Sequence, residues 1–455
     1  MRINSLKPKT QFVLFCLSTV ICFVVLGIFI ARVNELYPYT TENLKQLYVE
    51  RFKMKKIIFL IVSVIMLSSC SSISEKTADN LDLKMIYDYE RPCVETADGY
   101  YSTASINGAE YNIIYTDYAT NETIALCNRA ECKHNDNNCT SYIDNSNSLI
   151  FTDNNYLYLA NTGIVGNLQT IEPYMIARII RKDLNGSNDK VIYEFPANTS
   201  IIGSFVEDAD NNLYFITRRA EKNENDVDYK RYLTKLTPSG ELTDIGEVSF
   251  NDLIFGALND KIYLLNMPVN NNYSLTEYSL SSQKNDTILK WQAGDYKGQI
   301  YNGYFCYVDT QNNTVNKYDL ANRKNEIIVS DFNYRKDDIN FYKIIDNEML
   351  MSVRDMSNGL DNSEYKRISV NIEDHRVKQS SLSYVDGTKS YPVSILGSYN
   401  DKYYVIHGSE YRTIQLPGKN GSWYETEGEF SKYAMISKSD YWAGIPNYDE
   451  TKISY

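Results

Sequence analysis

The stretch Asn211-Asn212-Leu213-Tyr214-Phe215 joins a polar turn to a strand of large apolar residues, and the same combination recurs along the chain. Asn and Asp favour tight turns, whereas aromatic and aliphatic residues favour strands. The other copies begin at the turns Asp98-Gly99, Asn154-Asn155, Asp260-Lys261, Asn302-Gly303, Asn347-Glu348 and Asp401-Lys402. The chain therefore contains seven copies of one turn-and-strand unit.

The last turn residues of successive copies lie 42 to 57 residues apart, which leaves room for four short strands in each interval. A period of about 40–50 residues with several strands per unit is typical of a β-propeller. Radial packing of its blades buries both faces of every sheet. We therefore predict an all-β chain whose residues 86–455 form a β-propeller, with seven blades of four-stranded antiparallel sheet rather than six or eight. A pair of two-sheet sandwiches with similar turns is the alternative.

Composition agrees with an exported β protein. Tyrosine, a strand-favouring residue, accounts for 40 of the 455 residues. The first 69 residues carry nine Lys and Arg against three Asp and Glu, so the whole-chain charge of −12 leaves −18 for residues 70–455. Such an acidic domain stays soluble and argues against a basic face for DNA, RNA or an anionic membrane surface. We therefore expect no nucleic-acid partner.

Residues 54–70 read Met-Lys-Lys-Ile-Ile-Phe-Leu-Ile-Val-Ser-Val-Ile-Met-Leu-Ser-Ser-Cys and contain the parts of a bacterial lipoprotein signal. Two lysines precede an uncharged apolar run, and small residues then lead to a cysteine in the lipobox Leu67-Ser68-Ser69-Cys70. The pattern predicts a signal peptide over residues 54–69 and a diacylglycerol on Cys70. The propeller would then be anchored to the cell membrane on its extracytoplasmic face. A short buried helix that ends in a chance cysteine is the alternative.

A second apolar run lies upstream. Residues 12–31 carry no charge, and their number is sufficient for a transmembrane helix. If translation began at the first methionine, the short second run would have to return through the membrane against the positive-inside rule. We therefore interpret Met54 as the start and residues 1–53 as an upstream extension, with a true N-terminal anchor and an internal lipobox as the alternative. Residues 70–85 are predicted to be a flexible tether.

Four cysteines cluster near the first repeat. Cys93 is followed by the spacing Cys127-x4-Cys132-x-His134-x4-Cys139, which defines a Cys-rich loop over residues 127–139. Four cysteines in an exported chain most often form two disulfides. Each bridge would add about 2–4 kcal/mol, and the sequence allows three pairings. The alternative is a zinc site made by Cys127, Cys132, His134 and Cys139, because thiolates and imidazole suit tetrahedral zinc.

The same segment carries a family resemblance. The run from Tyr115 to Cys127, followed by Cys132-x-His134 and Cys139, resembles DUF5050-type propellers, which are exported lipoproteins of Gram-positive anaerobic bacteria. The tail Tyr433-Ala-Met-Ile-Ser-Lys-Ser-Asp-Tyr-Trp442 with Ile445-Pro446 resembles their C-terminal end. The resemblance covers most of residues 85–450. It implies a surface propeller of unknown ligand and supplies no catalytic residues.

The remaining residues give little sign of catalysis. His375 lies in a charged turn, His407 ends a strand, and the chain lacks the serine-hydrolase elbow, the phosphate loop and the His-Glu-x-x-His zinc motif. The run from Asp208 to Asn212 resembles the start of a calcium loop, but the glycine and final acid that such a loop needs are absent, so we interpret it as a turn. Cys306 is expected to be a lone buried thiol. No catalytic residue is predicted.

Three functions fit these observations. The first is a binding or scaffold module for a glycan, peptide or protein, in which Trp291, Trp423 and Trp442 either line a binding face or belong to the core between blades. The second is a propeller enzyme that acts on glycans or peptides. The third is an accessory or sensor lipoprotein of a membrane transporter. We favour the first of these, with the membrane as a partner through the lipid anchor.

Overall fold

The computed structural model describes residues 81–89, 94–105, 111–127, 129–135, 137–143, 148–165, 176–222, 227–332, 334, 338–355, 364–387, 389–417 and 422–454. They belong to a compact unit that begins at Asn80. The upstream extension with its apolar run at residues 12–31, the signal peptide, Cys70 and Cys93 lie outside the described residues. Within the described part of the chain, no helix is long and apolar enough to cross a membrane.

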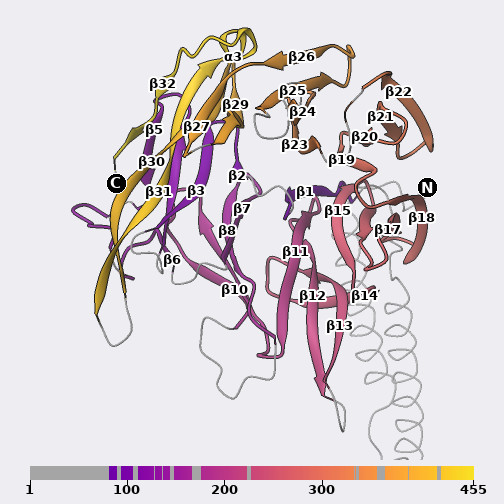
Figure 1. Ribbon diagram of the computed structural model, residues 1–455. Coiled ribbons are helices and arrows are strands. Elements are labelled where there is room, and N and C mark those ends of the chain that lie inside the picture. The colour runs from indigo at the N-terminus through magenta and orange to yellow at the C-terminus, as the bar shows by residue number, and fades with distance from the viewer. Residues whose placement is uncertain are drawn as a thin grey trace, which may run out of the picture. The chain divides into compact units, whose positions relative to one another are not determined.

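Seven antiparallel sheets follow one another around a ring in chain order, which confirms the seven-bladed propeller (Figure 1). The first three blades, each ordered from its inner to its outer strand, have the following bounds. Blade 1 consists of β2 (Val94–Glu95), β3 (Gly99–Ser105), β4 (Tyr111–Asp117) and β5 (Glu122–Ala125), with β6 (Tyr142–Ile143) also paired to β4. Blade 2 consists of β7 (Ser148–Thr152), β8 (Tyr156–Asn161), β9 (Arg178–Asp183) and β10 (Lys190–Glu194). Blade 3 consists of β11 (Thr199–Glu207), β12 (Leu213–Lys222), β13 (Val227–Leu236) and β14 (Leu242–Val248).

The other four blades repeat this order. Blade 4 consists of β15 (Asp252–Leu258), β16 (Lys261–Asn266), β17 (Asn272–Ser279) and β18 (Lys284–Gln292). Blade 5 consists of β19 (Tyr296–Tyr301), β20 (Tyr304–Asp309), β21 (Thr314–Asp319) and β22 (Lys324–Val329). Blade 6 consists of β23 (Ile339–Ile345), β24 (Glu348–Asp355), β25 (Glu364–Asn371) and β26 (Val377–Ser380). Blade 7 consists of β29 (Ser394–Tyr399), β30 (Lys402–Pro417), β31 (Trp423–Ser437) and β32 (Asp449–Glu450), preceded by the hairpin β27 (Ser383–Asp386) and β28 (Lys389–Pro392) and containing helix α3 (Lys438–Ala443).

The repeated turn of the sequence connects the first and second strands of all seven blades. In blade 3, one carboxylate oxygen of Asp208 accepts hydrogen bonds from the backbone N–H groups of Asp210 and Asn212, and the other accepts from the hydroxyl of Tyr214. Asn211, in the same turn, adopts a positive φ of 59°, which Asn tolerates better than most residues. The interpretation of Asp208–Asn212 as a turn is therefore confirmed.

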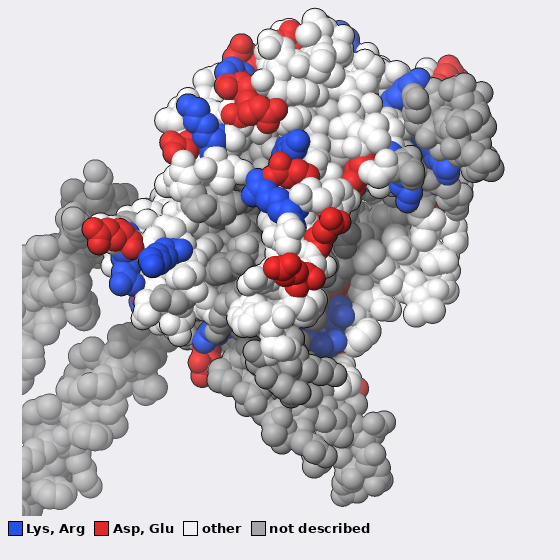
Figure 2. All heavy atoms as spheres, turned by 60° about the vertical axis from the view of Figure 1, so that its left-hand side comes forward, with Lys and Arg blue, Asp and Glu red and all other residues white. Residues whose placement is uncertain are grey.

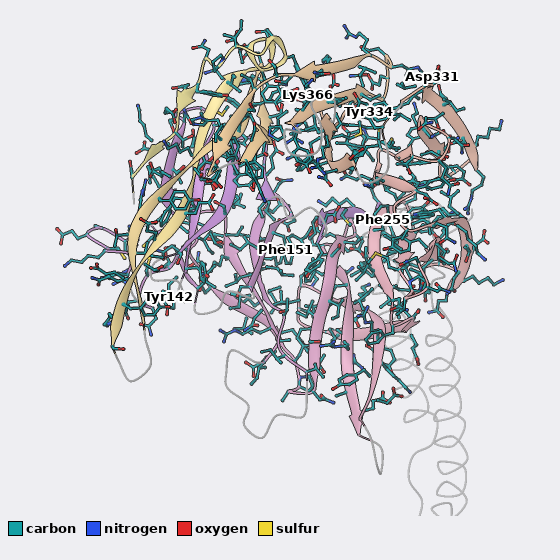
Figure 3. All side chains as sticks on the ribbon, in the orientation of Figure 1. Tyr142, Phe151, Phe255, Asp331, Tyr334 and Lys366 are labelled. Atoms are coloured by element: carbon teal, nitrogen blue, oxygen red, sulfur yellow. The ribbon has the colours of Figure 1, made fainter. Side chains whose placement is uncertain are left out.

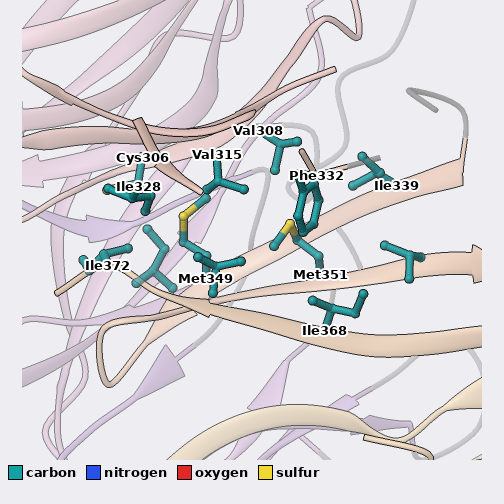
Figure 4. Packing of buried hydrophobic residues seen from close by; sticks show 13 residues of the cluster. Cys306, Val308, Val315, Ile328, Phe332, Ile339, Met349, Met351, Ile368 and Ile372 are labelled. Carbon is teal, nitrogen blue, oxygen red and sulfur yellow. The ribbon is translucent and has the colours of Figure 1, made fainter. Parts of the chain in front are cut away.

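Seven clusters of buried apolar residues form the core, one between each pair of neighbouring blades. Phe151 of blade 2, labelled in Figure 3, stacks on Phe205 of blade 3 with ring centroids 4.3 Å apart. The cluster between blades 5 and 6 contains Cys306, Met349 and Met351 (Figure 4). These contacts supply the burial that a single four-stranded sheet cannot provide for itself.

The tether predicted for residues 70–85 does not extend over residues 81–85. Strand β1 (Lys84–Tyr87) pairs with β11 on the inner edge of blade 3. Leu83 is 4% exposed, and its backbone N–H donates to the carbonyl of Asn259 in blade 4. The prediction was wrong for residues 81–85 because Leu81, Leu83 and Met85 alternate with polar residues, which is the pattern of a half-buried strand.

The two ends of the ring meet where blade 7 lies beside blade 1. Strand β32 pairs with β31 of blade 7, and the strand after it, β33 (Lys452–Ile453), pairs in parallel with β5 of blade 1. The apolar cluster at this junction has only three buried members, Tyr118, Tyr404 and Met435. Each of the other six clusters in the described residues has at least eight. The C-terminal residues therefore close the ring at the junction with the smallest core.

Candidate metal centre and central cavity

The Cys-rich loop interrupts the outer strand of blade 1. Strand β5 pairs with one part of β4, from Ile114 to Asp117, and the short strand β6 pairs with Tyr111 and Asn112 of the same β4. The backbone N–H of Leu126 donates to the carbonyl of Ile113, and the N–H of Ile113 donates to the carbonyl of Ser141. Both ends of the loop are thus fixed on Ile113.

The loop brings together the four side chains of the zinc hypothesis. The sulfur atoms of Cys127, Cys132 and Cys139 and a ring nitrogen of His134 all lie within 4.8 Å of one another. His134 Nδ1 lies 3.3 Å from Cys139 Sγ. Three thiols and one imidazole at this separation can hold a metal ion, and this donor set suits zinc.

Burial and hydrogen bonds shift the pKa values of two of the thiols in opposite directions. Burial by itself would raise the pKa of Cys127, but hydrogen bonds from the Thr140 side chain and from backbone N–H groups outweigh it and lower the pKa to about 6. Burial raises the pKa of Cys139 to about 11, and its hydrogen bonds with Cys127 and Cys132 act in the same direction. A thiol that ionises near neutral pH is already in the form that binds metal.

Residues outside the loop fix its backbone. Asn112 Nδ2 donates to the carbonyl of His134 at 2.6 Å, and Asn112 Oδ1 accepts from the Ser141 hydroxyl at 2.9 Å. Ser141 Oγ also lies 2.9 Å from Cys139 Sγ. From blade 2, Lys182, which is only 2% exposed, donates to the carbonyl of Thr140 at 3.0 Å. Blades 1 and 2 therefore hold the backbone of the loop that carries the four candidate ligands.

The expected pair of disulfides is not present among the described cysteines. Cys127, Cys132 and Cys139 are free thiols in the structure, and the fourth member of the predicted pairs, Cys93, lies outside the described residues. A disulfide framework needs the cysteines in pairs, whereas this loop gathers three of them around one histidine. The arrangement matches the alternative prediction of a metal-binding cluster.

A cavity of about 540 Å³ occupies the middle of the ring. Its walls come from β1 and from the innermost strands of blades 1, 2, 4, 5 and 6, including residues 83–88, 255–258 and 299–303. This volume falls within the range typical of small-molecule sites. A second cavity of about 680 Å³ lies between blades 1 and 2 and is lined by Tyr101, Tyr115 and Cys127 among others.

Glu95 and Lys343 form an ion pair in the wall of the central cavity. Lys343 Nζ of β23 lies 3.8 Å from a carboxylate oxygen of Glu95 in β2, and the backbone N–H of Ser398 donates to Glu95 at 2.6 Å. Burial raises the pKa of Glu95, and the nearby Lys343 opposes the rise. The cavity therefore presents a carboxylate and an ammonium group side by side in a partly desolvated setting.

The other residues singled out from the sequence have structural positions. Cys306 is fully buried between blades 5 and 6, and burial raises its pKa to about 12, which confirms the lone buried thiol. Trp291 stacks on Tyr296 at the interface between blades 4 and 5, with centroids 5.3 Å apart. Trp442 donates to the hydroxyl of Tyr403 inside blade 7. Of the three tryptophans, Trp423 is exposed, and it is the first residue of β31.

Charged side chains are interspersed on the surface. On the face shown in Figure 2, Lys and Arg alternate with Asp and Glu, with no large area of one sign. His375 is exposed in the turn after β25, and His407 lies 3.0 Å from Glu450 and stacks on Tyr448. His375 and His407 both lie outside the two cavities.

Sequence reasoning missed the central cavity and its ion pair. Glu95 and Lys343 are about 250 residues apart, and neither belongs to a motif, so only the closed ring brings them together. It also missed Lys182, which holds the Cys-rich loop from a neighbouring blade. The sequence carried no clear signal for it, because β9 reads Arg-Ile-Ile-Arg-Lys-Asp, without a regular apolar alternation that would mark Lys182 as buried.

Comparison with protein families supports the lipid anchor. Residues 54–71 match the prokaryotic membrane lipoprotein lipid attachment site, which supports attachment of the chain to a membrane by lipid. No curated protein matches the chain. An oligogalacturonate lyase in complex with manganese is 12% identical, with a TM-score of 0.45 over 80% of this chain and 92% of that one.

Two further solved structures are similarly distant. An oligogalacturonate lyase from Vibrio parahaemolyticus is 12% identical, with a TM-score of 0.44 over 81% of this chain and 96% of that one. Dipeptidyl peptidase 4 from Porphyromonas gingivalis is 11% identical, with a TM-score of 0.42 over 81% of this chain and 60% of that one. The lipid attachment match and the order of the sheets together describe a lipoprotein β-propeller, and its Cys3His cluster can hold a metal.

Proposed function

We propose that this protein is a binding or scaffold module for a glycan, peptide or protein, held on the extracytoplasmic face of the cell membrane by a diacylglycerol on Cys70. The lipid attachment match supports the anchor. The observation that carries the binding role is the central cavity, because six inner strands converge on it and place a charged pair in its wall.

The chemistry of the cavity restricts the ligand. Glu95 and Lys343 largely neutralise each other, so the wall offers both a donor and an acceptor without a strong net charge. Asn302 and Tyr301 line the same space. Such a wall favours a polar ligand that both donates and accepts hydrogen bonds, such as a sugar or a peptide backbone, over a polyanion.

Glycan and peptide arrays probed with residues 70–455 test this role, followed by calorimetric titration of each hit. We expect Lys343→Met and Glu95→Gln to weaken binding about tenfold or more, because each removes one charged group from the cavity wall and leaves the opposite charge uncompensated in a partly buried setting. Lys284→Met, at an exposed lysine of β18, is the matched control and should leave affinity unchanged. Hits that bind all three variants equally would place the ligand elsewhere. Catalytic turnover that depends on one carboxylate would replace the binding role with an enzymatic one.

Zinc is our proposal for the metal of the Cys3His cluster. A set of three thiolates and one imidazole prefers zinc to calcium or magnesium, which take oxygen ligands. Four protein ligands fill a tetrahedron, which is typical of a structural rather than a catalytic site. Elemental analysis of purified protein should give one zinc per chain. Protein with no bound metal and with Cys127, Cys132 and Cys139 oxidised would restore the disulfide interpretation.

Membership of the DUF5050-type propellers is proposed on the same loop. The residues that carry the resemblance fall in the metal-binding cluster and in the segment formed by β31 and α3. An alignment of that family is the test. If its members lack the Cys-x4-Cys-x-His-x4-Cys spacing, the assignment fails, whereas a shared spacing that aligns with blade 1 supports it.

A further inference from the structure

We propose that the Cys3His centre is a structural latch for the whole ring: by fixing the interrupted outer strand of blade 1, it holds the strand to which the C-terminus binds. This inference rests on the proposed metal and assigns it a task. The centre would thus stabilise the junction of blades 7 and 1, although it lies on the opposite side of blade 1.

The outer strand of blade 1 is short on both sides of the Cys-rich loop. Strand β5 has four residues and ends at Ala125, and Cys127 follows two residues later. At the other end of the loop, Cys139 comes three residues before β6, which has only two residues. Short strands at the edge of a sheet open readily. A bond through one ion between Cys127 and Cys139 would restore the continuity that the outer strand lacks.

Strand β5 also pairs with the C-terminal strand β33. The backbone N–H of Ser454 donates to the carbonyl of Thr123, and that of Lys452 donates to the carbonyl of Asn121. The Ser454 hydroxyl also donates to Glu122 at 2.6 Å. Both residues of β33 are exposed, so backbone pairing rather than burial retains it. If β5 opens, β33 loses its partner within the described part of the chain.

Buried hydroxyl groups connect β5 to blade 7 through the interior. The hydroxyl of Thr123 in β5 lies 2.8 Å from that of Thr116 in β4, which lies 3.2 Å from the hydroxyl of Tyr404 in β30. Tyr404 is one of the three buried residues in the small core of this junction. Movement of β5 would therefore disturb the core as well as the exposed strand.

Hydrogen exchange measured by mass spectrometry tests the latch on the whole mature protein, with and without zinc removed by a chelator under reducing conditions. Closing a loop of this length shifts an opening equilibrium by on the order of a hundredfold, so amides of residues 122–126 and 449–454 should exchange about tenfold faster or more without metal. Residues 272–279 in β17, on blade 4, should exchange at an unchanged rate.

Two variants make the result specific. Cys132→Ser removes one ligand without touching β5, and it should reproduce the effect of the chelator. Lys133→Ala, at an exposed neighbour in the same loop, should retain both the metal and slow exchange. If zinc binds but its removal changes exchange only within residues 127–139, the latch is wrong while the metal assignment stands. If no zinc binds, both proposals fall.

Discussion

Asn121 connects blade 1 to the C-terminal residues and offers a direct test of how the ring closes. Its side-chain amide donates to the carbonyl of Asp449 at 2.8 Å and to that of Glu450 at 3.2 Å, and its side-chain oxygen accepts from the Thr451 hydroxyl at 2.9 Å. Asn121 is 7% exposed and has a positive φ of 53°. Asn121→Ala therefore removes three hydrogen bonds and places a methyl side chain in the left-handed region.

The expected loss of unfolding free energy follows from these contacts. Three hydrogen bonds at about 1 kcal/mol each, with two carbonyls left short of a donor, amount to about 3 kcal/mol. The strain of an alanine at positive φ destabilises the fold by about 1 kcal/mol more, and glycine avoids this strain because it has no Cβ. We expect Asn121→Ala to lower the free energy of unfolding by about 4 kcal/mol and Asn121→Gly by about 3 kcal/mol.

Denaturant unfolding of residues 70–455, followed by tryptophan fluorescence, measures both changes. Asn400→Ala is the matched control, because Asn400 has a φ of 51° in an exposed turn of blade 7 and makes no side-chain hydrogen bond to the described residues. It should lose only the backbone contribution, about 1 kcal/mol. If Asn121→Ala costs no more than Asn400→Ala, the C-terminal residues do not close the ring in the way described.

Three further results are expected. Burial raises the pKa of Glu207 from its usual 4.5 to about 7. The stability that this carboxyl group contributes is therefore complete below pH 4.5, and the free energy of unfolding falls by about 3 kcal/mol as the pH rises to 7. Glu207→Gln should flatten this part of the profile of unfolding free energy against pH, and an unchanged profile would exclude the effect. Cys306→Ser places a hydroxyl in a fully buried apolar cluster and should cost about 1–3 kcal/mol without changing zinc content, as thermal melts and elemental analysis would show. Lys182→Met leaves the carbonyl of Thr140 without its donor and should cost about 1–3 kcal/mol, with faster hydrogen exchange in the Cys-rich loop; exchange equal to that of the unaltered protein would count against the support from blade 2.

The propeller could be predicted because its signal is local and repeated. Each copy needs a polar turn that tolerates positive φ and then an apolar strand, as at Asn211 and Tyr214, and both properties can be read within a few residues. The number of blades followed from counting copies. The pairing of β33 with β5 could not be predicted, because it joins residues about 330 apart and a two-residue strand has no periodicity.

The candidate site was predicted in part for the same reason. The ligands from Cys127 to Cys139 are close in sequence, so their spacing indicated a cluster. Disulfides were favoured over a metal because exported proteins commonly form them. The central cavity depends on the curvature of the ring, and its ion pair joins Glu95 of blade 1 to Lys343 of blade 6. Such a contact has no sequence signature in a single chain.

Mass spectrometry of the native protein tests whether it is a lipid-anchored propeller with a metal centre in its first blade. The native intact mass of protein extracted from membranes reports the anchor and the metal together. We expect a chain that begins at Cys70, carries a diacylglycerol and retains one zinc, which is lost in acid. A chain that begins elsewhere without lipid, or one with no metal and two fewer hydrogens for each disulfide formed, would contradict it.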